Sequence, residues 1–218
     1  MIKEVEDALN HPIMEQYKEP HRKYHNVEHI EHMLSYIPMI KDSKLLTSVE
    51  LEALILMILY HDAVYNIPDP DRTNEELSAK LFEAHYPDPM PYRVAIIDAI
   101  LATKHHQPSN ISSMALRILI DLDLIALADD ELRAKNDVKI RDEMRLSGEE
   151  DLLTWYKGRM MWLSKFLERP KIFFSPIGRP FEEQTRKALE NDLRQIRLDI
   201  NKERVKREFS NEKFWRKV

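Results

Sequence analysis

The feature that most constrains this fold is a long apolar segment, "TSVELEALILMILYHD", at residues 47–62. Thr47 followed three residues later by Glu50 is the signature of a capping box, which predicts that a helix begins here. Residues 54–59 are all apolar, so this part of the helix has no polar face. Because a helix that is apolar on every side must be surrounded by other elements, we predict a central helix inside a helical domain.

The rest of the sequence also favours helices. Only 3 of the 218 residues are glycine, and strand-like alternation of polar and apolar residues is hard to find. We therefore predict an all-α protein with a single domain over residues 1–218. Its parts are a site-bearing core at about residues 20–130, C-terminal helices at about 130–206 and a basic tail at about 207–218.

Local patterns give more specific expectations. Apolar residues at helical spacing predict one helix over residues 26–40, "NVEHIEHMLSYIPMI". A further helix is expected to begin at "NEELSA", with Asn74 as its N-cap and acidic residues in its first turn.

Composition limits the classes of function. Without cysteine the chain has no disulfide and no thiolate metal site, so any metal must be held by His, Asp and Glu. No apolar run approaches the roughly 18–20 residues of a membrane span, and we expect no membrane partner and a cytoplasmic location. From residue 186 onward there are 11 Lys and Arg against 6 Asp and Glu. Because the signs are mixed, as on a solvated helix, a nucleic-acid partner is not expected.

Polar residues interrupt the apolar pattern in several places. His61 and Asp62 end the central helix, where burial is costly unless both groups find partners, and a cation satisfies both. His25 and His29 are four residues apart, so on a continuous helix they would share a face, with His32 near its margin. The alternative is a polar helix face at the surface.

Two further segments carry candidate ligands. Asp121 and Asp123 interrupt the apolar run "LIDLDLIAL", and on a helix they point about 200° apart. We expect one of them to face inward, with the other on the surface. His105 and His106 follow a predicted helix end, where they suit the helix dipole or a metal. Together, the nitrogen and oxygen ligands suit Mn, Fe, Co, Ni or Zn.

Six segments, in order over about residues 20–195, make the chain similar to a known family: "YHNVEHI", "YHDAVYN", "NEELSA", "LATKHH", "LIDLDLIAL" and "IFFSPIGRPFEEQTRKALENDL". They resemble the HD superfamily of metal-dependent phosphohydrolases, and within it a group of predicted metal-dependent HD phosphohydrolases. The resemblance implies an all-helical HD bundle with an additional C-terminal helical extension. It also implies the metal ligands His29, His61, Asp62 and Asp123.

The segment "YHNVEH" is also similar to one in cyclic-nucleotide phosphodiesterases, another HD branch. That likeness implies His25 as a general acid and His29 as a ligand. The chain departs from the phosphodiesterases after the His-Asp pair, where "AVYN" stands in place of a further His. A second ion would instead use His105 or His106, and Lys104 is a candidate phosphate contact.

The acidic pair in "NEELSA" resembles one that follows the HD motif in alarmone hydrolases. This implies that Glu75, or else Glu76, orients a water, although acidic residues are also ordinary in the first turn of a helix. Lys23 and Arg72 are weaker candidates for phosphate contacts.

The implied function is a divalent-metal-dependent phosphohydrolase that uses metal-activated water on a phosphoester or phosphoanhydride of a small, nucleotide-like substrate. The ion would be Mn, Fe, Co, Ni, Zn or Mg. Two alternatives stay open: an HD-fold di-iron oxygenase and a non-catalytic helical scaffold with a basic tail. The sequence leaves the substrate and the oligomeric state open, and Tyr24, Tyr60 and Tyr65 suit either base stacking or core packing.

Overall fold

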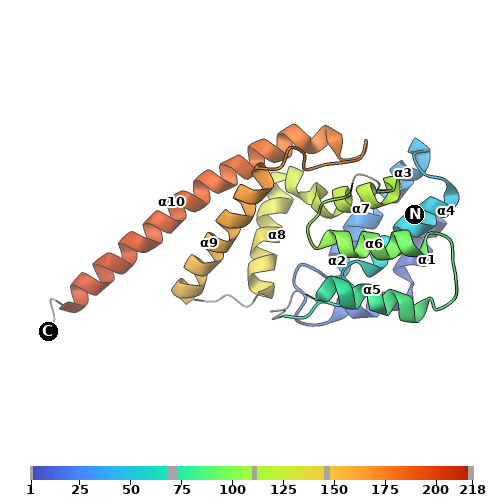
Figure 1. Ribbon diagram of the computed structural model, residues 1–218. Coiled ribbons are helices and arrows are strands. Elements are labelled where there is room, and N and C mark those ends of the chain that lie inside the picture. Colours follow the sequence, from blue (N-terminus) through green and yellow to red (C-terminus); the bar gives the residue numbers. More distant parts are fainter. Residues whose placement is uncertain (1, 68–72, 110–111, 145–147, 216–218) are drawn as a thin grey trace. The chain divides into compact units, whose positions relative to one another are not determined.

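A computed structural model describes the backbone of residues 2–67, 73–109, 112–144 and 148–215, and their side chains except at 148–151 and 207–215. Every regular element in these ranges is a helix, which confirms the all-α prediction (Figure 1). The chain divides into two compact units, Met1–Ala126 with Phe173–Phe181, and Leu127–Ile172 with Glu182–Val218. The single domain over residues 1–218 stays a prediction.

The first unit is built around one buried helix. Its elements are α1 (Lys3–Leu9), the 3-10 helix η1 (Pro12–Lys18), α2 (Val27–Leu34), α3 (Ile37–Ser43), α4 (Ser48–Tyr60), α5 (Asn74–His85), α6 (Arg93–Thr103), α7 (Met114–Leu124) and the short 3-10 helix η3 (Arg179–Phe181). Helices α1, α2, α5, α6 and α7 all pack against α4 (Figure 1). The predicted central helix is therefore confirmed.

The start and the burial of α4 follow from its sequence. The backbone N–H of Glu50 donates to Thr47 Oγ1 at 3.3 Å, and the N–H of Thr47 donates to the Glu50 carboxylate at 2.8 Å. The predicted capping box is thus present. Leu54, Met57 and Ile58 are fully buried, and each such side chain contributes roughly 1.5–3 kcal/mol by leaving water.

Two local predictions were wrong at helix boundaries. The helix expected over residues 26–40 is two helices, α2 and α3, because Pro38 lies in the first turn of the second one, where its missing N–H costs least. The N-cap position of α5 is Thr73 rather than Asn74. The Asn74 side chain instead bonds to the backbone N–H and carbonyl of Asn66, and so holds these two residues together at the start of α5.

Both aspartates of α7 are turned inward, so the expectation that one would lie on the surface was wrong. Asp121 is fully buried. Its carboxylate accepts hydrogen bonds from the backbone N–H groups of Phe174 and Ser175, both at 2.7 Å, and from the Ser175 hydroxyl at 2.5 Å. These three donors hold the late segment Phe173–Phe181 against α7, within the first unit.

The end of α4 is held by aromatic hydroxyls. Tyr17 is buried and donates to the carbonyl of Leu59 at 3.0 Å. The Tyr60 hydroxyl lies 2.7 Å from His85 Nδ1, and its buried ring packs edge-on against Phe82. Tyr60 is therefore a core residue, and not a group for stacking on a base. These contacts fix the last turn of α4, from which the polar pair at residues 61 and 62 continues.

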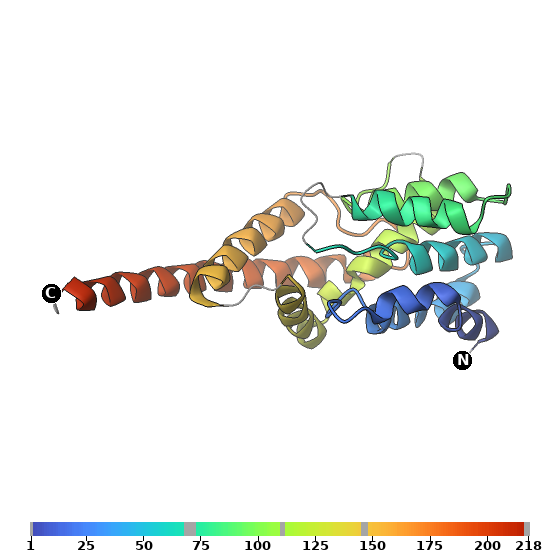
Figure 2. The same ribbon diagram turned by 90° about the horizontal axis from the view of Figure 1, so that it is seen from below.

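The second unit contains α8 (Asp130–Glu143), α9 (Gly148–Leu167) and α10 (Glu182–Trp215). Arg133 on α8 forms two bonds with the Asp192 carboxylate on α10, at 2.7 and 3.3 Å. Figure 2 shows the C-terminal part of α10 continuing well past the beginning of α9. The side chains of the predicted basic tail, residues 207–218, lie outside the described residues.

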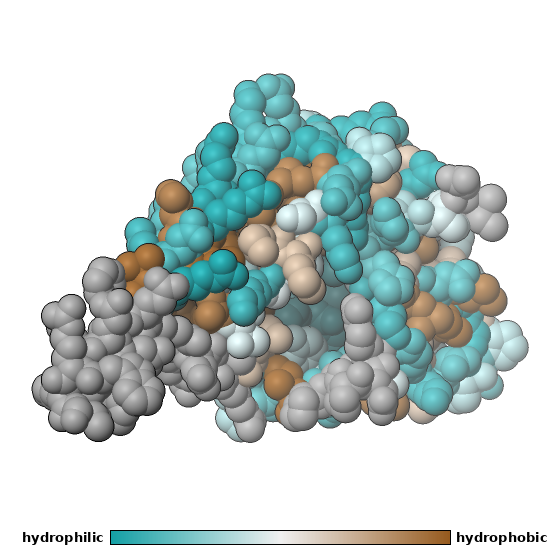
Figure 3. All heavy atoms as spheres, turned by 60° about the vertical axis from the view of Figure 1, so that its left-hand side comes forward, coloured by the Kyte–Doolittle hydropathy of each residue, from teal (hydrophilic) through white to brown (hydrophobic). Residues whose placement is uncertain are grey.

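The polar character of the surface agrees with the 33% content of charged residues. The face in Figure 3 is predominantly hydrophilic, with hydrophobic residues in small groups between polar ones. Among the described residues, no helix combines the length and the apolar character that a membrane crossing requires.

Gly178 and Gly158 lie in contrasting surroundings, one crowded and one open, and together they provide a matched test of packing. A Cβ at Gly178 would lie 2.6 Å from Asp121 Oδ2 and 2.7 Å from the Phe173 ring, whereas a Cβ at Gly158 on α9 would meet nothing within 4 Å. We expect Gly178→Ala to lower the free energy of unfolding by about 1–3 kcal/mol. Gly158→Ala should raise it by about 0.5–1 kcal/mol. Urea unfolding measures both, and a Gly178→Ala variant as stable as the wild type would contradict the described packing.

The surroundings of His11 should make the free energy of unfolding depend on pH. Its Nδ1 accepts from the backbone N–H of Ile13, and burial, followed by the nearby His85, lowers its pKa below 6.5. The folded protein therefore binds fewer protons at this site than the unfolded chain, and stability falls as the pH drops through 6.5. His11→Asn keeps a capping acceptor but does not titrate. From about pH 8 to about pH 5.5 the wild type should lose stability relative to this variant, and a constant difference would refute the assignment.

Candidate metal centre

His61 is presented by the end of α4. Its backbone N–H donates to the carbonyl of Met57, and its side chain is buried. Nδ1 lies 2.8 Å from the carbonyl of Ile58, so the proton on this nitrogen is donated to that oxygen. In the neutral ring the lone pair is then on Nε2, which is the arrangement of a metal-binding imidazole.

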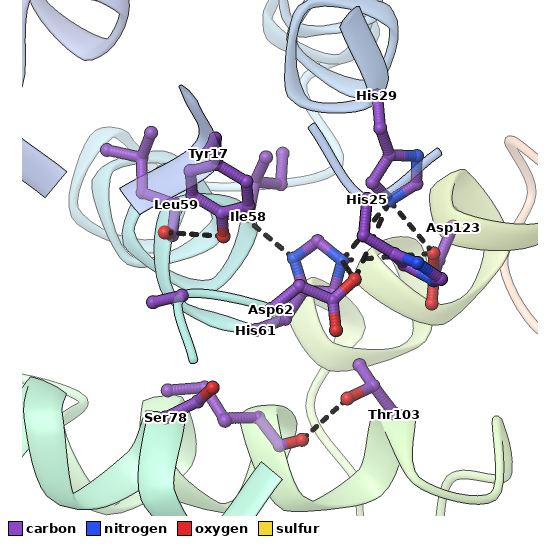
Figure 4. A network of polar contacts seen from close by, with 12 residues as sticks. Tyr17, His25, His29, Ile58, Leu59, His61, Asp62, Ser78, Thr103 and Asp123 are labelled. Atoms are coloured by element: carbon purple, nitrogen blue, oxygen red, sulfur yellow. Dashed lines mark hydrogen bonds and ion pairs between the residues drawn. The ribbon is translucent and has the colours of Figure 1, made fainter. Parts of the chain in front are cut away.

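Two other helices bring their side chains to the same point (Figure 4). His29 on α2 is buried, and its Nε2 lies 3.3 Å from His61 Nε2 and 3.3 Å from Asp123 Oδ1. Asp123 on α7 therefore faces the two imidazoles, while Asp121 faces the opposite side of the helix. One ligand atom from each of His29, His61 and Asp123 lies within 4.8 Å of the others.

Asp62 supplies a second carboxylate at the edge of this group. Its Oδ2 is 3.0 Å from His61 Nε2 and 4.0 Å from His29 Nε2. Asp62 thus lies beside the group, and its predicted role as a metal ligand stays a prediction.

The electrostatics of the centre favour positive charge between the carboxylates. Burial alone lowers the pKa of His61, but Asp62, with a smaller contribution from Asp123, outweighs burial and raises it to about 9. Burial alone raises the pKa of Asp123, whereas hydrogen bonds from His106 and then His29 bring it well below its usual range. A cation is favoured here for the same reason that a protonated imidazole is.

The spacing of these atoms fits a divalent ion. Ligands about 2.1 Å from an ion in tetrahedral or octahedral geometry lie about 3.0–3.4 Å from one another. The distances from His29 Nε2 to its two neighbours, both 3.3 Å, fall in this range, and the third distance, from His61 Nε2 to Asp123 Oδ1, is longer at 3.8 Å. The residues present therefore fit a metal held by His29, His61 and Asp123, with Asp62 adjacent.

Of the three candidates for a second metal or phosphate contact, His106 reaches the centre. Its Nε2 is 3.0 Å from Asp123 Oδ2, and its φ of 48° places its backbone in the left-handed region, which costs a non-glycine residue about 1–2 kcal/mol. Lys104 is engaged with Glu76 at 2.6 Å, and His105 is exposed. The prediction that a second ion uses His105 or His106 is untested.

Of the two candidate catalytic residues, His25 lies beside the centre, and Glu75 is near enough to Asp62 for the charge of that carboxylate to affect its pKa. His25 precedes α2, so the expectation that it shares a helical face with His29 was wrong, although the two ring centroids are 6.0 Å apart. Its ring stacks on Tyr65 (Figure 4 shows it beside the centre). Glu75 lies in the first turn of α5, and burial, together with the charge of Asp62, raises its pKa. His32 instead packs against Tyr36.

Lys23 and Arg72 are the weaker candidates for phosphate contacts. Lys23 is exposed and donates to the carbonyl of Pro20. Arg72 lies outside the described residues.

Sequence reasoning missed one residue, Arg22. Its guanidinium is buried and donates to the carbonyls of Asp62, Ala63 and His25. It thus joins the turn that carries Asp62 to the segment that carries His25. No local pattern marks an arginine in an irregular segment as buried, so only its place beside "YHN" offered a signal.

Removal and return of metal test the centre directly. Chelated protein that receives Mn²⁺, Co²⁺, Ni²⁺ or Zn²⁺ should be stabilised by about 2.7 kcal/mol when the free ion is at a hundred times its Kd. Asp123→Asn should abolish this shift, because it removes one of the three converging ligands. The matched control is His32→Asn, which removes an imidazole of α2 that lies against Tyr36. Thermal unfolding measures the shift, and an equal shift in Asp123→Asn would rule out this centre.

We found no match to this chain among protein-family models, curated proteins or solved structures. Support for the centre therefore comes from the residues of this chain and their geometry, and membership of the HD superfamily stays a prediction.

Proposed function

We propose that this protein is a divalent-metal-dependent phosphohydrolase that acts in the cytoplasm on a nucleotide-like substrate. It would cleave a phosphoester or phosphoanhydride bond. One observation carries the proposal: three helices bring the nitrogen and oxygen atoms of His29, His61 and Asp123 within 4.8 Å of one another in buried surroundings. Such a donor set, on an otherwise apolar scaffold, is suited to a metal ion.

His29, His61 and Asp123, with Asp62 beside them, would hold the ion. When bound, a divalent ion supplies a water of lowered pKa and polarises a phosphoryl oxygen. Mn, Fe, Co, Ni, Zn and Mg are all candidates. The carboxylates of Asp62 and Asp123 would offset the charge of the ion, and the hydrogen bond from His61 Nδ1 to Ile58 fixes the orientation of that imidazole.

Two residues have proposed roles in moving or holding protons. His25 would protonate the departing oxygen of the substrate, because its ring lies beside His29 and is partly exposed. Glu75 would orient the attacking water, a role supported by its position close enough to Asp62 for the two charges to interact. Proton transfer by a positioned side chain typically contributes about 10²–10⁴-fold to a rate.

The contact between His106 and Asp123 favours one alternative. A di-iron oxygenase needs a second ion and further imidazole ligands, and His106 lies 3.0 Å from Asp123 Oδ2. Iron content and oxygen uptake distinguish this class from a hydrolase. A non-catalytic scaffold is less well supported, because the converging nitrogen and oxygen donors of His29, His61 and Asp123 suit a metal ion.

A panel of nucleotides tests the proposal. Phosphate or nucleoside release would be measured with Mn²⁺, Co²⁺, Ni²⁺, Mg²⁺ and Zn²⁺ in turn. We expect metal-dependent turnover that falls by at least about 100-fold in Asp62→Ala and in Asp123→Asn, because the charge stabilisation that an ion provides is worth several kcal/mol.

Asp42→Asn is the control, since Asp42 is an exposed carboxylate on α3. Turnover that survives Asp123→Asn would contradict the proposal, because the activity would then not depend on this centre. Absence of turnover from folded, metal-loaded protein across the panel, combined with oxygen uptake by the iron form, would replace the hydrolase with the oxygenase.

A further inference from the structure

The irregular segment before α2 is organised by one buried cation. Arg22 Nη1 donates to the carbonyl of Asp62 at 2.7 Å and to that of His25 at 3.2 Å. Nη2 donates to the carbonyl of Ala63 at 2.9 Å, and Nε donates to the Glu19 carboxylate at 2.8 Å. All three guanidinium nitrogens are therefore used, and the side chain has no exposed surface.

This arrangement needs the shape of arginine. A guanidinium is a rigid planar fork with donors in fixed directions, whereas a lysine ammonium is a single point of charge. Arg22 reaches the carbonyl of His25 and those of Asp62 and Ala63 at the same time. It thus ties the backbone of the proposed general acid to the turn that follows the His-Asp pair.

Tyr65 holds the other side of the same imidazole. Its ring stacks on that of His25 with centroids 4.1 Å apart and planes 27° apart. The Arg22 guanidinium lies 5.6 Å from the centroid of the Tyr65 ring, and His21 Nε2 lies 2.8 Å from the Tyr65 carbonyl. Tyr24 packs edge-on against His25 at 4.7 Å. Both the backbone and the ring of His25 are thus restrained.

We infer that Arg22 and Tyr65 are positioning residues that hold the His25 imidazole in orientation beside the metal centre. The inference rests on the proposed function for the role of His25 as proton donor. Without the contacts of Arg22 and Tyr65, a partly exposed imidazole would sample several rotamers. Because proton donation requires a specific geometry, restricting the ring to one orientation raises the rate of bond cleavage.

Leaving groups of different basicity separate positioning from a general structural role. An alkyl phosphate such as a nucleoside monophosphate needs a proton on its departing oxygen, whereas p-nitrophenyl phosphate releases a stable phenolate without one. We expect Tyr65→Leu to lower kcat at least about 10-fold on the alkyl ester and less than about 2-fold on the nitrophenyl ester. Tyr65→Phe, which keeps the stacked ring, should restore the alkyl rate.

A double-mutant cycle tests whether the effect passes through His25. In a His25→Gln background, Tyr65→Leu should have no further effect on the alkyl ester, because the group that it positions is absent. Tyr36→Leu is the matched control, since it removes a tyrosine that packs against another imidazole, that of His32. Equal losses on both esters, or losses that add to that of His25→Gln, would overturn the inference.

The order of the His25 ring provides a readout that does not depend on turnover. Nuclear magnetic relaxation of the labelled ring should show it ordered in the wild type and more mobile in Tyr65→Leu and Arg22→Lys. An unchanged ring in both variants would refute the positioning role. If metal-loaded wild type hydrolyses neither ester, or if Asp123→Asn retains activity, the proposed function fails, and ring order alone then decides whether Arg22 and Tyr65 hold His25.

Discussion

The burial of ionisable groups at the end of α4 is the constraint on which the rest of the first unit depends. His61 is 1% exposed and follows a helix that is apolar on every side. An ionisable group in such surroundings is tolerated only when it is paired and hydrogen-bonded. The neighbouring helices therefore have to supply carboxylates and imidazoles at this point. Helices α2 and α7 do so with His29 and Asp123, and their packing against α4 sets the distances in the centre.

Two further buried charges secure the irregular segments around the ligand-bearing helices. Arg22 is a cation surrounded mainly by backbone carbonyls, whereas Asp121 is an anion surrounded by backbone N–H groups and one hydroxyl. In each case a side chain satisfies polar backbone atoms that no helix or sheet satisfies. Arg22 anchors the segment that carries His25, and Asp121 anchors α7 from the side opposite Asp123. Arg22 and Asp121 are thus two buried charged residues that have structural roles close to the centre.

The sequence predicted those features that have a local cause. The capping box and the central position of α4 follow from residues next to one another in the chain, and they are confirmed. His61 and the aspartate pair of α7 were identifiable because polar residues in apolar surroundings require partners, whereas the choice of His29 and Asp123 came from the HD resemblance; the structure brings His29, His61 and Asp123 together. The HD resemblance added their expected grouping, which periodicity alone does not give.

The features that the sequence did not predict arise from contacts between distant segments. Asp121 was expected to alternate with Asp123 between core and surface, but a segment more than 50 residues later covers it. Asn74 satisfied the usual preference for an N-cap, yet its amide is engaged by the backbone of Asn66. His25 lies outside α2, so its position depends on Arg22 and Tyr65 rather than on helical spacing. Tertiary partners decided each of these cases.

The role of His106 depends on how many metal ions the centre holds, because His106 contacts one of the two carboxylate oxygens of Asp123. Oδ1 faces His29, and Oδ2 faces His106. With a single ion held by His29, His61 and Asp123, His106 would donate a hydrogen bond that orients the Asp123 carboxylate. His106 would also be a residue that could hold a second ion, and its Nε2 would then be a ligand instead of a donor. A positive φ at residue 106 is a cost that the chain bears in either case. The left-handed backbone at residue 106 accompanies the placement of the His106 imidazole against the second oxygen of Asp123, and this contact explains why the cost is tolerated.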